Sequence, residues 1–200
     1  MKILEIAIEL GDSMGTHYKK KYNRQTRRLQ KWDYGWNGKY FVTICTKNKQ
    51  HFFGEIKSKK MFLNDIGNIA NSFWLEITSH FKFVQLGKFV VMPNHIHGIV
   101  EIKKDRDWYF ENPPPKIDPN DTRTIGQRRF QNQGSATLSS IIGSYKSIVS
   151  RTARKINPKF AWQYRFDDRI IRDDRAYNNI SKYIEFNPRN WKDDRFFDSE

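Results

Sequence analysis

The protein is 200 residues long, a length that suits one domain and argues against two large independent cores. Its 36 lysine and arginine residues outnumber 22 aspartate and glutamate residues, and the formal net charge of +14 predicts a polyanionic partner, nucleic acid first. Aromatic residues make up 15% of the chain and apolar residues 38%, which excludes wholesale disorder.

Cysteine content and hydropathy bear on the compartment. The single cysteine, Cys45, excludes an intramolecular disulfide and a thiolate zinc site, which favours a reducing environment. Charged residues interrupt the apolar stretch 1–10, and no apolar run reaches the roughly 18 to 20 residues of a transmembrane helix. We therefore expect a cytoplasmic protein with no membrane partner.

A basic stretch at residues 17–31 is the first feature along the chain. Tyr18, Tyr22 and Trp32 alternate with its basic residues, and this mixture favours contact with phosphates and unpaired bases. A solvated basic tail is the competing interpretation. The basic candidates for DNA contact are Lys19, Lys20, Lys21, Arg24, Arg27 and Arg28.

Four elements are expected in the first half of the chain. Residues 40–46 are β-branched and aromatic, which predicts a strand. Residues 64–81 repeat their apolar side chains with a 3.6-residue period, which predicts a helix. Residues 83–92 and 95–102 are β-rich and are separated by Pro93-Asn94, so we expect an antiparallel pair joined by a tight turn.

The composition changes at residues 103–134. Three consecutive prolines, many charges and turn-forming residues predict a flexible excursion without a packed element. Residues 137–156 then carry apolar side chains at helical spacing, which predicts an amphipathic helix.

The chain continues with a predicted strand at residues 160–171. A last helix is expected to begin near Asp173 or Asp174 and to end near Asn187, because Pro188 disfavours helical geometry in the residue before it. The resulting order of strands and helices predicts an α+β fold, a ferredoxin-like sandwich with a central antiparallel sheet and helices on one face.

The segment 90–100, VVMPNHIHGIV, contains a pair of histidines two residues apart. On a strand, residues i and i+2 point to the same face about 7 Å apart, so His95 and His97 can converge on one metal ion. Two histidines on the surface of a sheet are the competing interpretation.

A second pattern lies near the C-terminus, in YIEFNP at residues 183–188. At positions i and i+4 of a helix, Tyr183 and Asn187 share one face, so a phenol and an amide oxygen lie close together. A tyrosine at the edge of the core and a helix-terminal asparagine would produce the same pattern.

Together the two patterns resemble the single-tyrosine HUH transposases, in particular the REP-associated tyrosine transposases and their insertion-sequence relatives. HUH denotes histidine, a hydrophobic residue and histidine. Further segments fit the same resemblance, among them RRLQKWDY, GKYFVTICTKNKQHFFGEI and WQYRFDDRIIRD, so that it covers residues 23–191. Residues 1–22 are then an N-terminal extension and residues 192–200 a C-terminal tail.

This resemblance implies cleavage and joining of single-stranded DNA by a tyrosine nucleophile, with transposition as the setting. Tyr183 would be the nucleophile, and His95, His97 and Asn187 would bind Mg²⁺ or Mn²⁺. Some relatives have glutamine where this chain has Asn187. The implied partner is single-stranded hairpin DNA of the REP type, the implied assembly is a homodimer, and the implied location is the nucleoid.

Three arginines of the segment 165–172 could bind phosphates, or they could be solvated strand residues. Two other functions stay open at this point: a DNA-binding protein or repressor that does not cleave, and a nuclease that uses water in place of Tyr183. The three arginines are Arg165, Arg169 and Arg172.

Overall fold

The computed structural model describes residues 28–29, 32–113, 119–124, 127–128, 134 and 136–197. Most of the predicted N-terminal DNA contact therefore lies outside the described residues, namely Lys19, Lys20, Lys21, Arg24 and Arg27. Within the described ranges, no helix is both long and apolar enough to cross a membrane.

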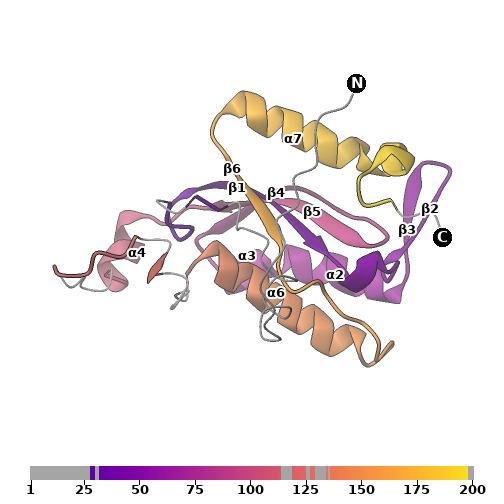
Figure 1. The fold of residues 1–200 in the computed structure, drawn as a ribbon, viewed down its shortest axis with the longest axis horizontal. Coiled ribbons are helices and arrows are strands. Elements are labelled where there is room, and N and C mark those ends of the chain that lie inside the picture. Colours follow the sequence, from indigo (N-terminus) through magenta and orange to yellow (C-terminus); the bar gives the residue numbers. More distant parts are fainter. Residues whose placement is uncertain are drawn as a thin grey trace, which may run out of the picture.

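A four-stranded antiparallel sheet forms the centre of the molecule (Figure 1). Its strands are β1 (Gly38–Cys45), β4 (Val84–Val91), β5 (His95–Ile102) and β6 (Asp167–Ile171), in the spatial order β4-β5-β1-β6. A helical connection leads from β1 to β4 and another from β5 to β6, which is the βαββαβ order of a ferredoxin-like fold. The predicted α+β class and antiparallel sheet are confirmed.

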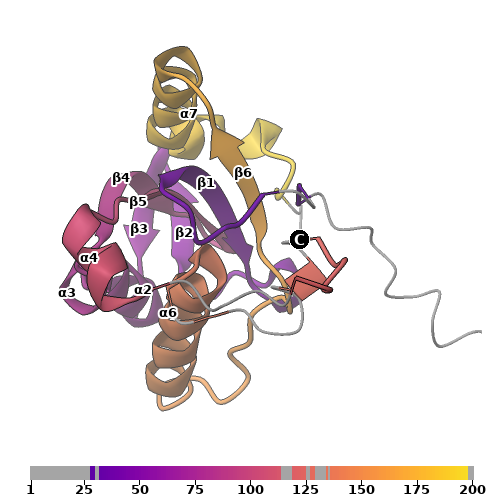
Figure 2. The ribbon, with the colours of Figure 1, turned by 90° about the vertical axis from the view of Figure 1, so that its left-hand side faces the viewer.

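Helices cover both faces of this sheet, as Figures 1 and 2 show. On one face, α2 (Asp65–Leu75), α3 (Ile77–His80) and α6 (Leu138–Ala153) enclose the main core, in which Trp74 and Tyr145 pack against the sheet. On the other face, α7 (Asp174–Phe186) packs over a smaller apolar cluster that includes Ile99 and Ile184.

The prediction placed all helices on one face, and the position of α7 differs from it. The reason lies in β5, where Ile96 and Val100 face the main core while Ile99 faces α7. Because β5 has apolar side chains pointing to both faces of the sheet, both faces must be covered by other elements. The apolar stripe of α7 supplies that cover on the second face.

Capping residues determine where the helices begin. The side chain of Asn64 accepts a hydrogen bond from the Gly67 amide at the start of α2, and Asp173 accepts one from the Ala176 amide at the start of α7. Thr137 and Ser140 form a reciprocal capping box at the start of α6. The predicted helices 64–81, 137–156 and 173–187 are thus confirmed, with the first divided into α2 and α3 at Glu76.

Three elements differ from the prediction. The excursion contains a short helix, α4 (Arg106–Glu111), which is capped by Asp105 and contacts the buried Lys104 through the ring of Trp108. The predicted strand 160–171 is regular only in β6, with one further bridge from Trp162 to Thr46. After α7 the chain continues as a 3-10 helix, η2 (Asn187–Asp193).

A β-ribbon was not predicted at all. After the short 3-10 turn η1 (Lys47–Lys49), strands β2 (Gly54–Lys57) and β3 (Lys60–Leu63) pair as an antiparallel hairpin. Its two-residue turn, Ser58-Lys59, has positive φ at both positions, 49° and 62°. Such turns usually carry Asn-Gly or Asp-Gly, so the usual sequence signal is missing here.

Candidate functional site

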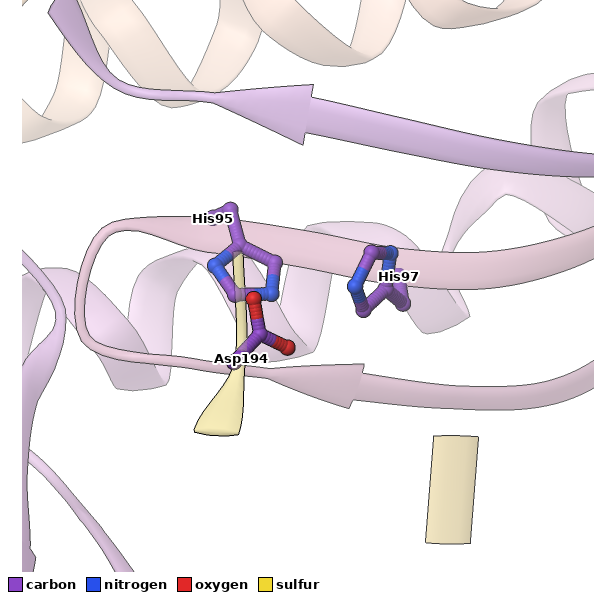
Figure 3. A group of neighbouring side chains, drawn as sticks. All are labelled: His95, His97 and Asp194. Carbon is purple, nitrogen blue, oxygen red and sulfur yellow. The ribbon is translucent and has the colours of Figure 1, made fainter. Parts of the chain in front are cut away.

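The two histidines of β5 lie side by side (Figure 3). They point to the same face of the sheet as Ile99, which is the face that α7 covers. Their ring centroids are 4.4 Å apart. Both side chains are buried, with relative exposures of 0% for His95 and 1% for His97, so they are not the solvated pair of the competing interpretation. Phe196 covers both rings, with centroids 4.5 Å from His95 and 5.8 Å from His97.

Hydrogen bonds orient the His95 ring. The amide of Asn94 donates to the Phe196 carbonyl at 2.9 Å, which directs its Oδ1 toward His95 Nδ1 at 2.8 Å. Because Oδ1 can only accept, Nδ1 carries the proton and Nε2 presents a lone pair. Nε2 is buried and has no hydrogen-bond partner among the described residues.

The second ring is held in the same way by the neighbouring strand. Thr43 lies opposite His97 in the register of β1 and β5, and its hydroxyl is 2.9 Å from His97 Nδ1. Hydrogen bonds at the distal nitrogen are typical of metal-binding histidines, since they fix the ring and its tautomer.

Burial keeps both imidazoles neutral. It lowers the pKa of His95 to about 3, assisted by the positive charge of Arg195. Burial also lowers the pKa of His97 well below its ordinary value, and the neighbouring His95 adds to this effect. A neutral imidazole is the form that binds metal ions.

Tyr183 extends from α7 toward the histidines. Its hydroxyl lies 3.1 Å from His97 Nε2 and donates a hydrogen bond to Asp194 Oδ2 at 3.3 Å. The ring packs edge-on against Phe41, and 43% of the side chain stays exposed. Partial burial, first, and the Asp194 carboxylate, second, together raise the pKa of Tyr183 to about 12, while Arg195 acts in the opposite direction.

Asn187 caps the C-terminal end of α7, one helical turn beyond Tyr183. Its side chain is buried and donates through Nδ2 to Asp194 Oδ2 at 2.7 Å. Its Oδ1 is buried without a hydrogen-bond partner among the described residues. Two orphaned buried atoms, this oxygen and His95 Nε2, therefore occur in one small region.

Asp194 belongs to the site although sequence reasoning placed it in a C-terminal tail. Single ligand atoms of His95, His97 and Asp194 lie within 4.8 Å of one another (Figure 3). The chain delivers Asp194 through η2, whose Trp191 is buried beside His95. No local pattern distinguishes Asp194 from Asp193 before it, so only the fold could identify this residue.

The residues present fit a divalent metal ion. Two neutral imidazoles and a carboxylate form a cluster that could bind such an ion, and the orphaned amide oxygen of Asn187 is a further oxygen donor. A pocket of about 260 Å³ opens beside this cluster, between the end of α7 and the segment after it. It is lined by Tyr183, Asn187, Asn190, Asp193, Asp194 and Arg195.

The other tyrosines considered lie elsewhere. Tyr145 is 2% exposed in the main core, where its hydroxyl donates to the Ala70 carbonyl. Tyr164 is almost fully exposed on the loop before β6. Tyr177, on α7, packs against the ammonium group of Lys39. Of these and Tyr183, only Tyr183 has its hydroxyl beside the histidines.

The predicted arginines do not form one group. Arg28 donates through Nε to the buried Asp168 at 2.6 Å and through Nη1 to Ser139, so it connects the start of the described chain to β6 and α6. Arg165, Arg169 and Arg172 are exposed on and around β6. Arg169 lies opposite Phe41 in the register of β1 and β6, on the same face of the sheet as the site.

Comparison with known proteins finds both similar sequences and similar solved structures. A Haemophilus influenzae protein described as uncharacterized is 37% identical over 177 residues, covering 88% of this chain and 94% of its own length. A second protein of that organism, described as a "Putative REP-associated tyrosine transposase", is 23% identical over 156 residues, covering 78% of this chain and 73% of its own. No protein-family model matches the chain.

One similar solved structure is that of a REP-associated tyrosine transposase bound to a REP hairpin. It superposes with a TM-score of 0.51 at 18% identity, covering 82% of this chain and 72% of the neighbour, and so bears on the fold. With 37% identity over most of both chains, this protein belongs to the same family as the uncharacterized Haemophilus influenzae protein, and it shares the fold of the REP-associated tyrosine transposases.

Proposed function

We propose that this protein is a metal-dependent, transposase-type endonuclease and strand transferase that cleaves single-stranded DNA at hairpin sequences of the REP type. The observation that carries the proposal is the position of the Tyr183 hydroxyl, 3.1 Å from a buried histidine of an HUH pair. The hairpin-bound neighbour supports the choice of substrate, as does the net charge of +14.

Tyr183 acts as the nucleophile. Its oxygen attacks the scissile phosphorus, a new phosphorus–oxygen bond forms to the tyrosine, and the bond to the 3′-oxygen of the preceding nucleotide breaks. The phenol loses its proton and the departing oxygen gains one, leaving a free 3′-hydroxyl and a 5′-phosphotyrosine. One diester replaces another, so the reverse reaction can join a new strand without a nucleotide cofactor.

Asp194 receives the phenol's hydrogen bond and orients its oxygen. Because burial and Asp194 raise the pKa of Tyr183 to about 12, the phenol is protonated at pH 7, and attack requires added positive charge or a proton acceptor. His95, His97, Asn187 and Asp194 would hold Mg²⁺ or Mn²⁺, which would supply Lewis-acid stabilisation and position the phosphate.

In the proposed arrangement Tyr183 acts with the histidines of its own chain, because its hydroxyl lies 3.1 Å from His97 Nε2. The homodimer implied by the family resemblance stays a prediction. If the substrate is a hairpin in the chromosome, the protein acts in the cytoplasm at the nucleoid, and this location stays a prediction.

A denaturing gel tests the proposal. The full chain is incubated with end-labelled single-stranded hairpin oligonucleotides from the source genome, with Mn²⁺, Mg²⁺ or EDTA. We expect a covalent protein–DNA adduct that forms only with metal, is absent in Tyr183→Phe and persists in Tyr177→Phe, a matched change on the same helix.

Two results would overturn the proposal. Cleavage without an adduct would assign the site to a hydrolytic nuclease, and binding without cleavage at any metal concentration would assign the fold to a DNA-binding protein. An adduct formed by Tyr183→Phe would overturn the nucleophile assignment alone.

A further inference from the structure

The β2–β3 ribbon carries a surface that the proposed chemistry does not use. In its register, Lys57 lies opposite Lys60 and Glu55 lies opposite Phe62, so these four side chains share one face of the ribbon. All four are exposed, Phe62 by 52%. Lys59 in the turn adds a third lysine at the tip.

The opposite face of the ribbon is anchored. Met61 and Leu63 pack against the main core and, with Phe89 and Val91 of β4, line the space between ribbon and sheet. Because side chains alternate along a strand, this packing fixes Lys57, Lys60 and Phe62 on the outward face.

Two features of the ribbon tip destabilise the folded protein. Like charges directly opposite one another in a ribbon are destabilising, and Lys57 and Lys60 occupy such positions. Ser58 and Lys59 hold positive φ, a conformation that side-chain-bearing residues rarely adopt. Within the described chain, Glu55 is the carboxylate that pairs with a tip lysine, at 2.6 Å from Lys57, and both partners are largely exposed.

This combination has the chemistry of a single-strand contact. Lysines neutralise phosphates, and an exposed aromatic ring between them can stack on an unpaired base. A fully paired duplex hides its base faces, so Phe62 suits a single strand better than a hairpin stem. The ribbon strands of four residues each span about 13 Å, enough for a few nucleotides.

The ribbon stands beside the candidate site. The Phe53 amide, at its base, bonds to the Pro93 carbonyl of the turn that leads into His95. Strand β3 contacts η2, the helix that delivers Asp194 (Figure 1). A strand that leaves the pocket next to Tyr183 would therefore meet the ribbon.

We propose that the outward face of the β2–β3 ribbon, formed by Lys57, Lys59, Lys60 and Phe62, binds the unpaired strand that flanks the hairpin. The lysines bind its phosphates and Phe62 stacks on one base. The choice of DNA as ligand rests on the proposed function, but binding at the ribbon requires no cleavage.

Fluorescence anisotropy with the full chain tests this surface. The probes are a labelled 12-nucleotide oligothymidylate and a labelled blunt hairpin without a tail, in the absence of added metal. We expect Phe62→Ala to weaken oligothymidylate binding roughly 5- to 150-fold, the range for one stacked base, and Phe62→Trp to restore it. Binding of the blunt hairpin should change little.

The lysines are tested by salt dependence. The logarithm of the oligothymidylate binding constant falls linearly with the logarithm of the salt concentration. The double variant Lys59→Gln, Lys60→Gln should make this slope shallower by about 1.4, or about 0.7 for each phosphate that a lysine no longer neutralises. The matched control is Lys82→Gln with Lys103→Gln, which removes the same charge at the opposite end of β4 and β5 and should leave the slope nearly unchanged.

Lys59→Gly separates binding from folding. Glycine adopts positive φ without strain, so this variant should melt at the same or a higher temperature while it binds oligothymidylate more weakly. A merely structural lysine would show no loss of binding.

The outcomes distinguish the two proposals. Ribbon variants that bind like the Lys82/Lys103 control overturn the ribbon proposal even if wild type forms the covalent adduct. If the ribbon variants lose affinity equally for oligothymidylate and for the blunt hairpin, the assignment of the ribbon to single strands is overturned. A wild type that forms no adduct, combined with the expected losses, overturns the proposed cleavage and leaves the ribbon proposal standing.

Discussion

The two faces of the sheet use similar residues for different purposes, and two tyrosines show the difference. Tyr145, on α6, is 2% exposed and donates its hydroxyl to a backbone carbonyl, so its polar atom is satisfied within the core. Tyr183, on α7, is 43% exposed and its hydroxyl meets a histidine and a carboxylate. A closed face tolerates a polar atom only when its partner is fixed, while a half-open face leaves the same atom accessible to a substrate.

The largest expected effect falls on the α7 face. His95→Ala or His97→Ala should abolish metal-dependent cleavage, because each removes a ligand from the candidate metal cluster. The same variants should lose the rise in melting temperature that Mn²⁺ produces in wild type. Asn187→Ala should retain part of both effects and recover with added Mn²⁺, since it removes one oxygen donor.

His80→Ala is the matched control for these variants. His80 is exposed on α3, on the other side of the sheet, and its loss should alter neither cleavage nor the effect of Mn²⁺. A His95→Ala, His97→Ala double variant that still cleaves with Mn²⁺ would contradict the metal assignment.

The next largest effect is on the closed face. A Cβ atom at Gly98 would lie 2.2 Å from Trp74, whose fully buried ring packs against Phe89 and Tyr145. Gly98→Ala should therefore lower the free energy of unfolding by about 3 kcal/mol, as overpacking of a dense core does. Urea denaturation measures this loss, and a change below about 0.5 kcal/mol would show that the core around Trp74 adapts to the added methyl group.

Tyr145→Phe should have a smaller effect on the same face. The ring and its packing remain, but the Ala70 carbonyl, which lies within α2, loses its second hydrogen bond, the one from the phenol, and this should cost about 0.5 to 1.5 kcal/mol. DNA cleavage by the folded variant should equal that of wild type. If Tyr145→Phe instead lost the covalent adduct and kept its stability, the nucleophile would be Tyr145 and the roles of the two tyrosines would be exchanged.

The smallest effect is expected on the outer surface of α6. A Cβ atom at Gly143 would meet nothing within 4 Å, and the residue is exposed inside the helix. Gly143→Ala should raise the free energy of unfolding by up to about 1 kcal/mol, because alanine is the better helix former. A melting curve that moves downward instead would indicate that this surface is covered by another part of the chain or by a partner.

Some features of the site were predictable because they depend on local geometry. The two-residue period of a strand places His95 and His97 on one face, and the 3.6-residue period of a helix places Tyr183 near Asn187. The helix starts at Asn64, Thr137 and Asp173 were predictable for the same reason, since each cap bonds to backbone amides of its own first turn.

The remaining features depend on contacts between residues that are distant in sequence. Asp194 enters the site only because η2 turns the chain back beneath the histidines, and Arg28 pairs with Asp168 across 140 positions. The ribbon turn at Ser58-Lys59 contradicts the usual turn residues, so its strands were missed. By itself, the sequence determined the periodicities, the caps and the histidine and tyrosine motifs. The tertiary structure decided the face that α7 covers, the carboxylate beside Tyr183 and the orientation of the lysine-bearing ribbon, because packing and long-range pairing select these positions.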